Sequence, residues 1–244
     1  MITRAVLFDL DDTLFDHWHC TNQALEALQG VHPGFRRWSL GEFGDRHALL
    51  LERFHLDVLA RRLTVDEARI QRFSHLMEET GEAATPDEAA AMAADYRRAY
   101  VAAWRMVPGA FELLEALHPH APIGVVSNNA VGEQIEKIRS CGLAPFLDTV
   151  VISEEAGVAK PDPRIFEIAL ARLGCTAEET VMVGDAWDND IAGARSAGVR
   201  AVWFNRFGVR APEFCHVAEL RSFEPADAAL ELILGRRGDA SPEM

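Results

Sequence analysis

The sequence is poor in basic residues and has neither a long apolar run nor a paired cysteine motif. Its 24 lysines and arginines are outnumbered by 38 aspartates and glutamates, so the 244 residues carry a formal net charge of −14. This charge argues against general nucleic-acid binding, which depends on Lys and Arg neutralising phosphates. No stretch approaches the ~20 apolar residues that span a bilayer, and no secretory signal is visible. We therefore expect a cytoplasmic protein, a monomer or homodimer, with neither nucleic acid nor membrane as a partner.

The four cysteines lie far apart in the chain and show no CxxC or similar spacing of metal ligands. They are Cys20, Cys141, Cys175 and Cys215. Without such spacing a zinc site is not indicated, and we expect the cysteines to be reduced. Hydrophobic residues make up 49% of the chain and charged residues 25%, which is enough apolar material for a well-buried core. The length allows one large domain, or one domain with a smaller insertion.

Five short apolar runs, one near the N-terminus and four much later in the chain, predict buried strands. They are residues 5–10, 123–127, 149–152, 181–184 and 201–204. Between the later runs, apolar residues recur at helical spacing, and one stripe consists of Val131, Ile135 and Ile138. Strands that alternate with helices form parallel sheets covered by helices on both faces. The predicted fold class is therefore α/β, with a Rossmann-like parallel sheet.

Residues 16–106 have a different pattern, without the alternation that is typical of strands. Capping-box sequences begin helices at Thr64 and at Thr85, the second with proline at the first helical position. A helical block between the first strand and the rest of the sheet has the layout of an inserted cap domain. We predict that residues 1–15 plus 107–244 form the α/β catalytic core and that residues 16–106 form the helical cap.

Polar residues follow four of the apolar runs, where open α/β sheets bind their ligands outside the carboxyl ends of the strands. In chain order they are Asp9, Asp11 and Thr13, then Ser127 and Asn128, then Lys160 before a proline, and finally Asp185 and Asp190. Taken singly, each has an ordinary explanation, because Asp and Ser often cap helices and turns and a loop lysine is usually solvated. Together, and in this order, they indicate an active site.

These residues resemble the four signature motifs of the haloacid dehalogenase superfamily, namely DxDxT, a serine at a strand end, a lysine before proline, and GDxxxxD. The resemblance covers the whole chain, since the position and helical character of the insertion match the C1 cap class of that superfamily. Residues 152–166 are particularly similar to members with nucleotide or sugar-phosphate monophosphatase activity. The resemblance implies a C1-capped, phosphatase-like enzyme that hydrolyses phosphoric monoesters.

The resemblance also implies a nucleophile, a general acid and base, and a magnesium ion. Asp9 is implied as the nucleophile, which divides hydrolysis into two easier displacements. Asp11, two positions further on, is implied as the general acid and base. Mg²⁺ would be bound by the Asp9 side chain, the Asp11 backbone carbonyl and Asp185, which are the hard oxygen donors that magnesium prefers. The implied substrate is a small phosphorylated metabolite, first a nucleoside monophosphate and second a sugar phosphate.

Further residues are implied to bind the phosphate or to support the catalytic groups. Ser127 and Asn128, at the start of the following helix, would bind phosphate oxygens. Lys160, both catalytic and phosphate-binding, would place a fixed positive charge against the phosphoryl group. Thr13 is expected to stabilise the turn after the first strand. Asp190 is expected to orient Lys160 or a metal-bound water rather than to bind the metal directly.

Three other functions remain open at this point. A phosphoglucomutase-like enzyme would use the same nucleophile and acid but transfer the phosphoryl group to a sugar phosphate, and no cap feature selects it. A 2-haloacid dehalogenase expels halide, which needs no proton, whereas Asp11 supplies an acid suited to an alkoxide leaving group. A catalytically silent binding module is disfavoured because the signature residues are intact.

Overall fold

The computed structural model describes residues 3–212 and 217–235 of the chain. Cys215 therefore lies outside the described residues. Within those two ranges, no helix is both long enough and apolar enough to cross a membrane. The chain divides into two compact units, each of which is described by itself below. We call Asp16–Arg105 the helical unit, and the described part of Met1–Phe15 and Met106–Met244 the sheet unit.

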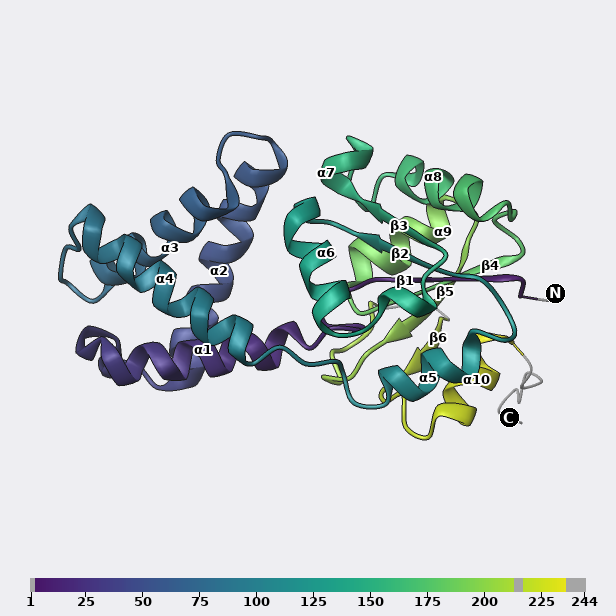
Figure 1. Cartoon of the computed structure of the whole chain (residues 1–244), viewed down its shortest axis with the longest axis horizontal. Coiled ribbons are helices and arrows are strands. Elements are labelled where there is room, and N and C mark those ends of the chain that lie inside the picture. Colours follow the sequence, from purple (N-terminus) through teal and green to yellow (C-terminus); the bar gives the residue numbers. More distant parts are fainter. Residues whose placement is uncertain (1–2, 213–216, 236–244) are drawn as a thin grey trace. The chain divides into compact units, whose positions relative to one another are not determined.

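The sheet unit is built on six parallel strands in the order β3-β2-β1-β4-β5-β6 (Figure 1). The strands are β1 (Ala5–Phe8), β2 (Ile123–Ser127), β3 (Thr149–Ile152), β4 (Thr180–Gly184), β5 (Arg200–Phe204) and β6 (Ala218–Leu220). The predicted Rossmann-like α/β fold is confirmed, and each of the five predicted runs overlaps one of β1 to β5, although the first extends two residues beyond β1. β6 was not predicted, because it is only three residues long and none of them is fully buried.

Strand β1 lies in the middle of the sheet, between β2 and β4. Val6 pairs with Ile123 of β2 and with Val181 of β4. Every residue of β1 is fully buried, as expected of a parallel strand that is covered on both faces. The ladder continues for one more residue, since the N–H of Asp9 donates to the carbonyl of Val183 at 2.9 Å. Asp9, the first of the predicted site residues, is therefore hydrogen-bonded directly to the sheet.

Helices cover both faces of this sheet, because right-handed connections that progress toward β3 and toward β6 lie on opposite sides of it. They are α5 (Ala110–Leu117), α6 (Val131–Ser140), η2 (Ala144–Phe146), α7 (Ser153–Ala156), α8 (Pro163–Leu173), the π-helical η3 (Trp187–Ala192), α9 (Gly193–Ser196) and α10 (Ala226–Ile233). α8 and α9 cover one face, where Phe166 and Ala194 share an apolar cluster with Leu7 and Met182 of the strands. α5 packs against α10 on the opposite side of the sheet (Figure 1).

Helix α6 buries a face that only partly matches the stripe predicted from its apolar spacing. Of the predicted stripe of Val131, Ile135 and Ile138, only Ile138 is buried. The other buried side chains of α6 are polar, Gln134 and Lys137. Residues three apart lie on one face of a helix, so these two point the same way. Val131 and Ile135 are half-buried, so the predicted stripe is only partly covered. The buried face also includes the polar pair, which finds partners in the sheet unit that helical spacing does not reveal.

The helical unit is described throughout and contains no strand. Its elements are α1 (His17–Val31), η1 (Pro33–Arg37), α2 (Leu40–Leu59), α3 (Val65–Glu79) and α4 (Pro86–Ala102). The predicted capping box before α3 is present. The Thr64 hydroxyl accepts from the Glu67 N–H at 3.2 Å, and the Glu67 carboxylate accepts from the Thr64 N–H at 2.8 Å. α4 begins in the same way at Thr85, so local sequence sets where both helices begin.

The helical unit has a core of its own that is rich in aromatic rings. The ring centroids of Phe35 and Phe43 lie 4.7 Å apart, and those of Phe73 and Tyr96 lie 5.1 Å apart. His47 is buried 5.1 Å from Tyr96, and burial, aided by a nearby arginine, lowers the pKa of this imidazole well below its usual value. The neutral ring therefore acts as part of the aromatic packing.

Candidate active site

Three neighbouring strands end at polar residues that meet at one edge of the sheet. β1 leads directly into Asp9, β2 ends at Ser127, and β4 leads directly into Asp185. Because the strands are parallel, their carboxyl ends lie at the same edge. Lys160 comes from the connection between α7 and α8, and Asp190 from η3. The structure thus brings the sequence-predicted residues together from distant parts of the chain.

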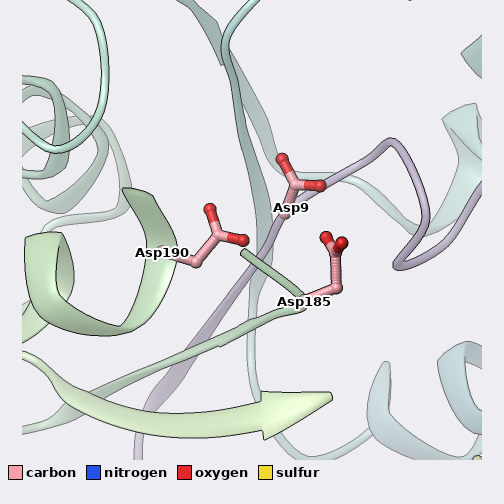
Figure 2. A group of neighbouring side chains, drawn as sticks. All are labelled: Asp9, Asp185 and Asp190. Carbon is pink, nitrogen blue, oxygen red and sulfur yellow. The ribbon is translucent and has the colours of Figure 1, made fainter. Parts of the chain in front are cut away.

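Three aspartates form an acidic cluster, and each reaches it from a separate segment (Figure 2). Oxygen atoms of Asp9, Asp185 and Asp190 all lie within 4.8 Å of one another. Asp9 is 7% exposed and Asp190 is fully buried. Carboxylates this close repel one another, and burial removes the water that would otherwise screen them. The cluster therefore needs positive charge beside it.

Lys160 supplies one such charge. Its Nζ donates to Oδ1 of Asp9 at 2.5 Å and to Oδ1 of Asp190 at 2.6 Å. The second oxygen of Asp190 accepts from the N–H of Ala186 at 2.9 Å. Both oxygens of Asp190 are thus engaged by the protein, one of them by Lys160. This geometry fits a residue that orients the lysine, and it leaves Asp9 and Asp185 as the better pair for a metal ion.

Burial and the neighbouring charges shift the pKa values of the aspartates and of Lys160. Burial raises the pKa of Asp9 to about 7, and Asp190 adds to the rise while Lys160 opposes it. Burial, with the charges of Asp9 and Asp190, also raises the pKa of Asp185 well above its usual value. Burial alone would lower the pKa of Lys160, but the two carboxylates that it contacts outweigh burial and raise it. A single lysine therefore leaves the aspartates short of compensating charge.

The donor atoms around Asp185 suit a hard divalent cation. Carboxylate oxygens are the ligands that Mg²⁺ and Ca²⁺ prefer. The hydroxyl of Thr13 donates to Oδ1 of Asp185 at 3.2 Å, and the indole N–H of Trp203 donates to the Asp185 backbone carbonyl at 2.8 Å. The first contact orients the carboxylate of Asp185, and the second holds its backbone. Thr13 thus contacts a predicted metal ligand, in addition to its place in the turn after β1.

The Asp11 side chain is held by two residues of α6 that the sequence did not indicate. Nζ of Lys137 donates to Oδ1 of Asp11 at 2.6 Å, and Nε2 of Gln134 donates to Oδ2 at 2.9 Å. Asn129 approaches the same Oδ2 more distantly, at 3.5 Å. The only sequence signal is a polar pair at helical spacing, and such pairs usually face solvent.

Ser127 and Asn128 follow one another at the end of β2 but have different partners. Oγ of Ser127 accepts from Nε2 of Gln134 at 2.6 Å, which leaves the serine O–H to donate elsewhere. The Asn128 amide accepts from the N–H of Lys160 and donates to its carbonyl, both at 2.8 Å. The Asn128 side chain therefore holds the loop that carries Lys160.

The turn that carries Asp11 and Thr13 is braced by a residue far along the chain. Asp12, between them, has a φ of 61°, in the left-handed region that residues other than glycine seldom adopt. Nη2 of Arg206 donates to Oδ1 of Asp12 at 2.5 Å. Arg206 follows β5, and no local pattern in the sequence links it to the first turn.

Comparison with known proteins places the chain among well-described relatives. Residues 3–198 match the haloacid dehalogenase-like hydrolase family. The chain is 34% identical over 209 residues to the ribulose-1,5-bisphosphate 5-phosphatase of Halopiger xanaduensis, covering 84% of this chain and 85% of that protein. It is 40% identical over 229 residues to the phosphoserine phosphatase of Thermus thermophilus, covering 83% and 89% respectively.

Among solved structures, the chain is similar to the HAD-hydrolase YfnB from Bacillus subtilis, whose structure was determined bound to magnesium. The TM-score is 0.74 at 27% identity, and the match covers 94% of this chain and 99% of that one. The match therefore covers both the parallel sheet and the helical insertion after β1. The chain belongs to the haloacid dehalogenase-like hydrolases.

Proposed function

We propose that this protein is a Mg²⁺-dependent phosphatase that hydrolyses a small phosphorylated metabolite through an aspartyl-phosphate on Asp9. The observation that carries the proposal is the contact of Lys160 with Asp9 at 2.5 Å, at the sheet edge where the Asp11 carboxyl is also held. A nucleophile, an adjacent cation and a nearby acid are the groups that stepwise phosphoryl transfer requires. The relatives named as phosphatases support the same class of reaction.

The acidic cluster fits the proposed metal because its donors are hard oxygens and its charge is undercompensated. The Asp9 and Asp185 side chains, with the Asp11 backbone carbonyl, would hold Mg²⁺. When bound, the ion supplies the positive charge that allows an anionic phosphate to approach a carboxylate nucleophile. Lys160 contributes a second, permanent positive charge, which lies at Oδ1 of Asp9.

In the first half-reaction, a carboxylate oxygen of Asp9 attacks phosphorus opposite the ester oxygen. A bond forms between Asp9 and phosphorus while the bond from phosphorus to the ester oxygen breaks. Asp11, in its protonated form, gives its proton to the leaving alkoxide. Lys160 and the hydroxyl of Ser127 donate to phosphoryl oxygens as charge develops on them.

In the second half-reaction, water attacks the phosphorus of the aspartyl-phosphate. Asp11, now a carboxylate, takes a proton from the attacking water and so returns to its starting form. The bond between phosphorus and Asp9 breaks, which restores the Asp9 carboxylate and releases inorganic phosphate. The same acid–base group thus serves both halves, and its proton is recovered in each cycle.

Asp11 also separates this proposal from dehalogenation. Halide leaves without a proton, so an acid held beside the nucleophile would have no task in that reaction. The phosphoglucomutase-like alternative would use all the same groups, and no feature of the described residues favours it over transfer to water.

The relatives bear on which substrate class is the better proposal. The Halopiger relative is named for a sugar bisphosphate and the Thermus relative for phosphoserine, and each match covers more than four-fifths of this chain, 84% and 83%. We therefore place sugar phosphates and other short phosphorylated metabolites ahead of nucleoside monophosphates, which reverses the order that the sequence motifs favoured.

The test is inorganic phosphate release from sugar phosphates, phosphoserine, phosphoglycolate, nucleoside monophosphates and an aryl phosphate. We expect turnover with Mg²⁺, none with EDTA, and a loss of about 10³-fold or more in Asp9→Asn. Asp162→Asn, at the half-buried N-cap of α8, is the matched control and should retain full activity. Release that persists in Asp9→Asn, or no release from any phosphate, would overturn the proposal.

A further inference from the structure

Helix α6 carries two buried polar side chains to which the mechanism above gives no role. Gln134 is fully buried and Lys137 is 2% exposed. Burying an amide or an ammonium group away from water is unfavourable unless it forms hydrogen bonds. Both side chains direct their donors to the same group, the carboxyl of Asp11.

The two contacts fix how the Asp11 carboxyl is turned. The terminal torsion of an aspartate is broad, so an unrestrained carboxyl group samples many orientations. Here Oδ1 is fixed at 2.6 Å by Lys137 and Oδ2 at 2.9 Å by Gln134. The ammonium group itself lies 5.0 Å from the ring centroid of Phe15, whose backbone bridges to that of Asp11.

Gln134 also links the acid to the predicted phosphate-binding hydroxyl. Its Nε2 carries two hydrogens, one donated to Asp11 and the other to Oγ of Ser127 at 2.6 Å. The amide cannot exchange its nitrogen and oxygen positions, because a flipped amide would place Oε1 against the Asp11 carboxylate, and the two oxygens would repel each other. Oε1 instead remains buried without a hydrogen-bond partner among the described residues. The fold therefore keeps the two donated bonds at the expense of an unsatisfied acceptor.

We propose that Lys137 and Gln134 are positioning residues that hold the Asp11 carboxyl in the orientation needed for proton transfer. Lys137 sets the plane of the carboxyl group, and Gln134 sets its place relative to the hydroxyl of Ser127. The proton and the breaking ester bond are those of the phosphatase mechanism, on which this inference rests. Both residues would act through the geometry of Asp11, and Gln134 would act through Ser127 as well.

The experiment compares two leaving groups within each variant. An alkyl phosphate needs a proton on its leaving oxygen, whereas the phenolate of p-nitrophenyl phosphate leaves without one. Single-turnover measurements of the first half-reaction on both substrates give a ratio of rates for each protein. That ratio does not depend on how much of a variant is folded. The variants are Lys137→Met, Lys137→Arg and Gln134→Leu, and Arg139→Met removes an exposed charge from the same helix as a control.

We expect Lys137→Met to lower the alkyl phosphate rate about 10²-fold and to leave the p-nitrophenyl phosphate rate unchanged. Lys137→Arg, which keeps a cationic donor, should recover most of the loss. Gln134→Leu should lower the same ratio and also weaken substrate binding, because Ser127 loses its partner. Arg139→Met should match wild type on both substrates.

Two results would overturn the inference. One is an equal loss on both substrates in Lys137→Met, since this would indicate a role in packing or phosphate binding rather than in positioning the acid. The other is an unchanged ratio in both Lys137→Met and Gln134→Leu. Failure of the phosphatase proposal is seen separately, because wild type and Asp9→Asn are measured in the same assay and would then show no Asp9-dependent turnover.

Discussion

The carboxylates at the sheet edge oppose the stability of the fold that holds them. Burial raises the pKa of Asp9 to about 7, which means that the charged form is less stable in the folded protein than in water. Asp185 is shifted in the same direction, and each aspartate adds to the shift of the other. Active sites commonly retain such unfavourable groups because the reaction needs them.

Asp9→Asn should therefore stabilise the metal-free protein, by an amount that depends on pH. The pKa of Asp9 is about 7 in the folded protein, against an ordinary value of 3.8. Between these values the unfolded chain has lost the Asp9 proton while the folded protein keeps it, so the stability of the wild type falls as pH rises. Asparagine has no such proton. Urea unfolding in EDTA should show a stability advantage of the variant that grows up to about pH 7 and then levels off.

Asp162→Asn is a control at a carboxyl group whose pKa is shifted in the opposite direction, downward instead of upward. A contact with Arg164 lowers the pKa of Asp162 to about 2, so its contribution is present above the ordinary carboxyl pKa and is lost only in strong acid. The difference in unfolding free energy between Asp162→Asn and wild type should be constant across the neutral pH range. A flat profile for Asp9→Asn as well would mean that Lys160 compensates the buried charge fully.

At the scale of elements, the connection from β4 to η3 brings two aspartates close together. β4 ends at Gly184, Asp185 follows, and Asp190 lies in the π-helical turn. π-helical turns are rare and often occur at functional sites. Here the turn allows Asp190 to contact both the Ala186 N–H and Lys160. It also brings Asp190 against the backbone of Gly184, where an added Cβ would lie 2.4 Å from Oδ2.

Gly184→Ala should therefore damage both stability and catalysis. The added methyl group has no room unless Asp190 moves, and overpacking of this kind costs about 1–3 kcal/mol. Movement of Asp190 would take Lys160 away from Asp9 and lower turnover. Thermal unfolding and phosphate release measure the two effects. Gly30→Ala in α1 is the control, since nothing lies within 4 Å of the added Cβ and alanine favours a helix by about 0.5–1 kcal/mol. Wild-type stability and activity in Gly184→Ala would refute this account.

The sequence predicts those parts of the fold in which one local pattern determines the structure. β1 to β5 are apolar on both faces, and a polar residue marks the end of the run at Asp9, Ser127 and Asp185. Parallel strands then bring these ends together without further information. Helix starts at Thr64 and Thr85 are equally local, since a capping box is complete within one turn.

The remaining features depend on partners that are distant in sequence. Lys137 lies in α6 as a polar residue among others, and only the folded sheet unit places Asp11 beside it. Arg206 meets Asp12 because β5 lies close to β1 in the sheet order. Asn128 was predicted as a phosphate ligand, and no motif indicates that its amide also pairs with the Lys160 backbone. A motif shows which residue is present, whereas its hydrogen-bond partner depends on the whole sheet.

At the scale of the whole molecule, each unit forms hydrogen bonds between the two chain segments at the points where the chain enters and leaves it. In the sheet unit, Phe15 and Met106 form an antiparallel bridge, and the N–H of Val107 donates to the Leu14 carbonyl at 2.9 Å. In the helical unit, the guanidinium of Arg105 donates to Oδ2 of Asp16 at 2.7 and 2.9 Å, and their backbones also pair. Each unit therefore brings its own chain ends together.

Separate closure and separate cores predict two unfolding transitions, of which a metal ion should shift only one. All the proposed metal ligands belong to the sheet unit, and a ligand stabilises only the structure that binds it, by about 2.7 kcal/mol at a hundredfold excess over Kd. For a unit of this size, that energy corresponds to roughly 5–10 °C. Calorimetry of the full chain in Mg²⁺ and in EDTA should show one transition displaced and the other fixed. Asp185→Asn should abolish the displacement by removing a ligand, while Asp162→Asn should leave it intact. If both transitions move together, or if only one is seen, the two cores unfold as a single cooperative system, and the insertion is then part of the structure that the metal stabilises.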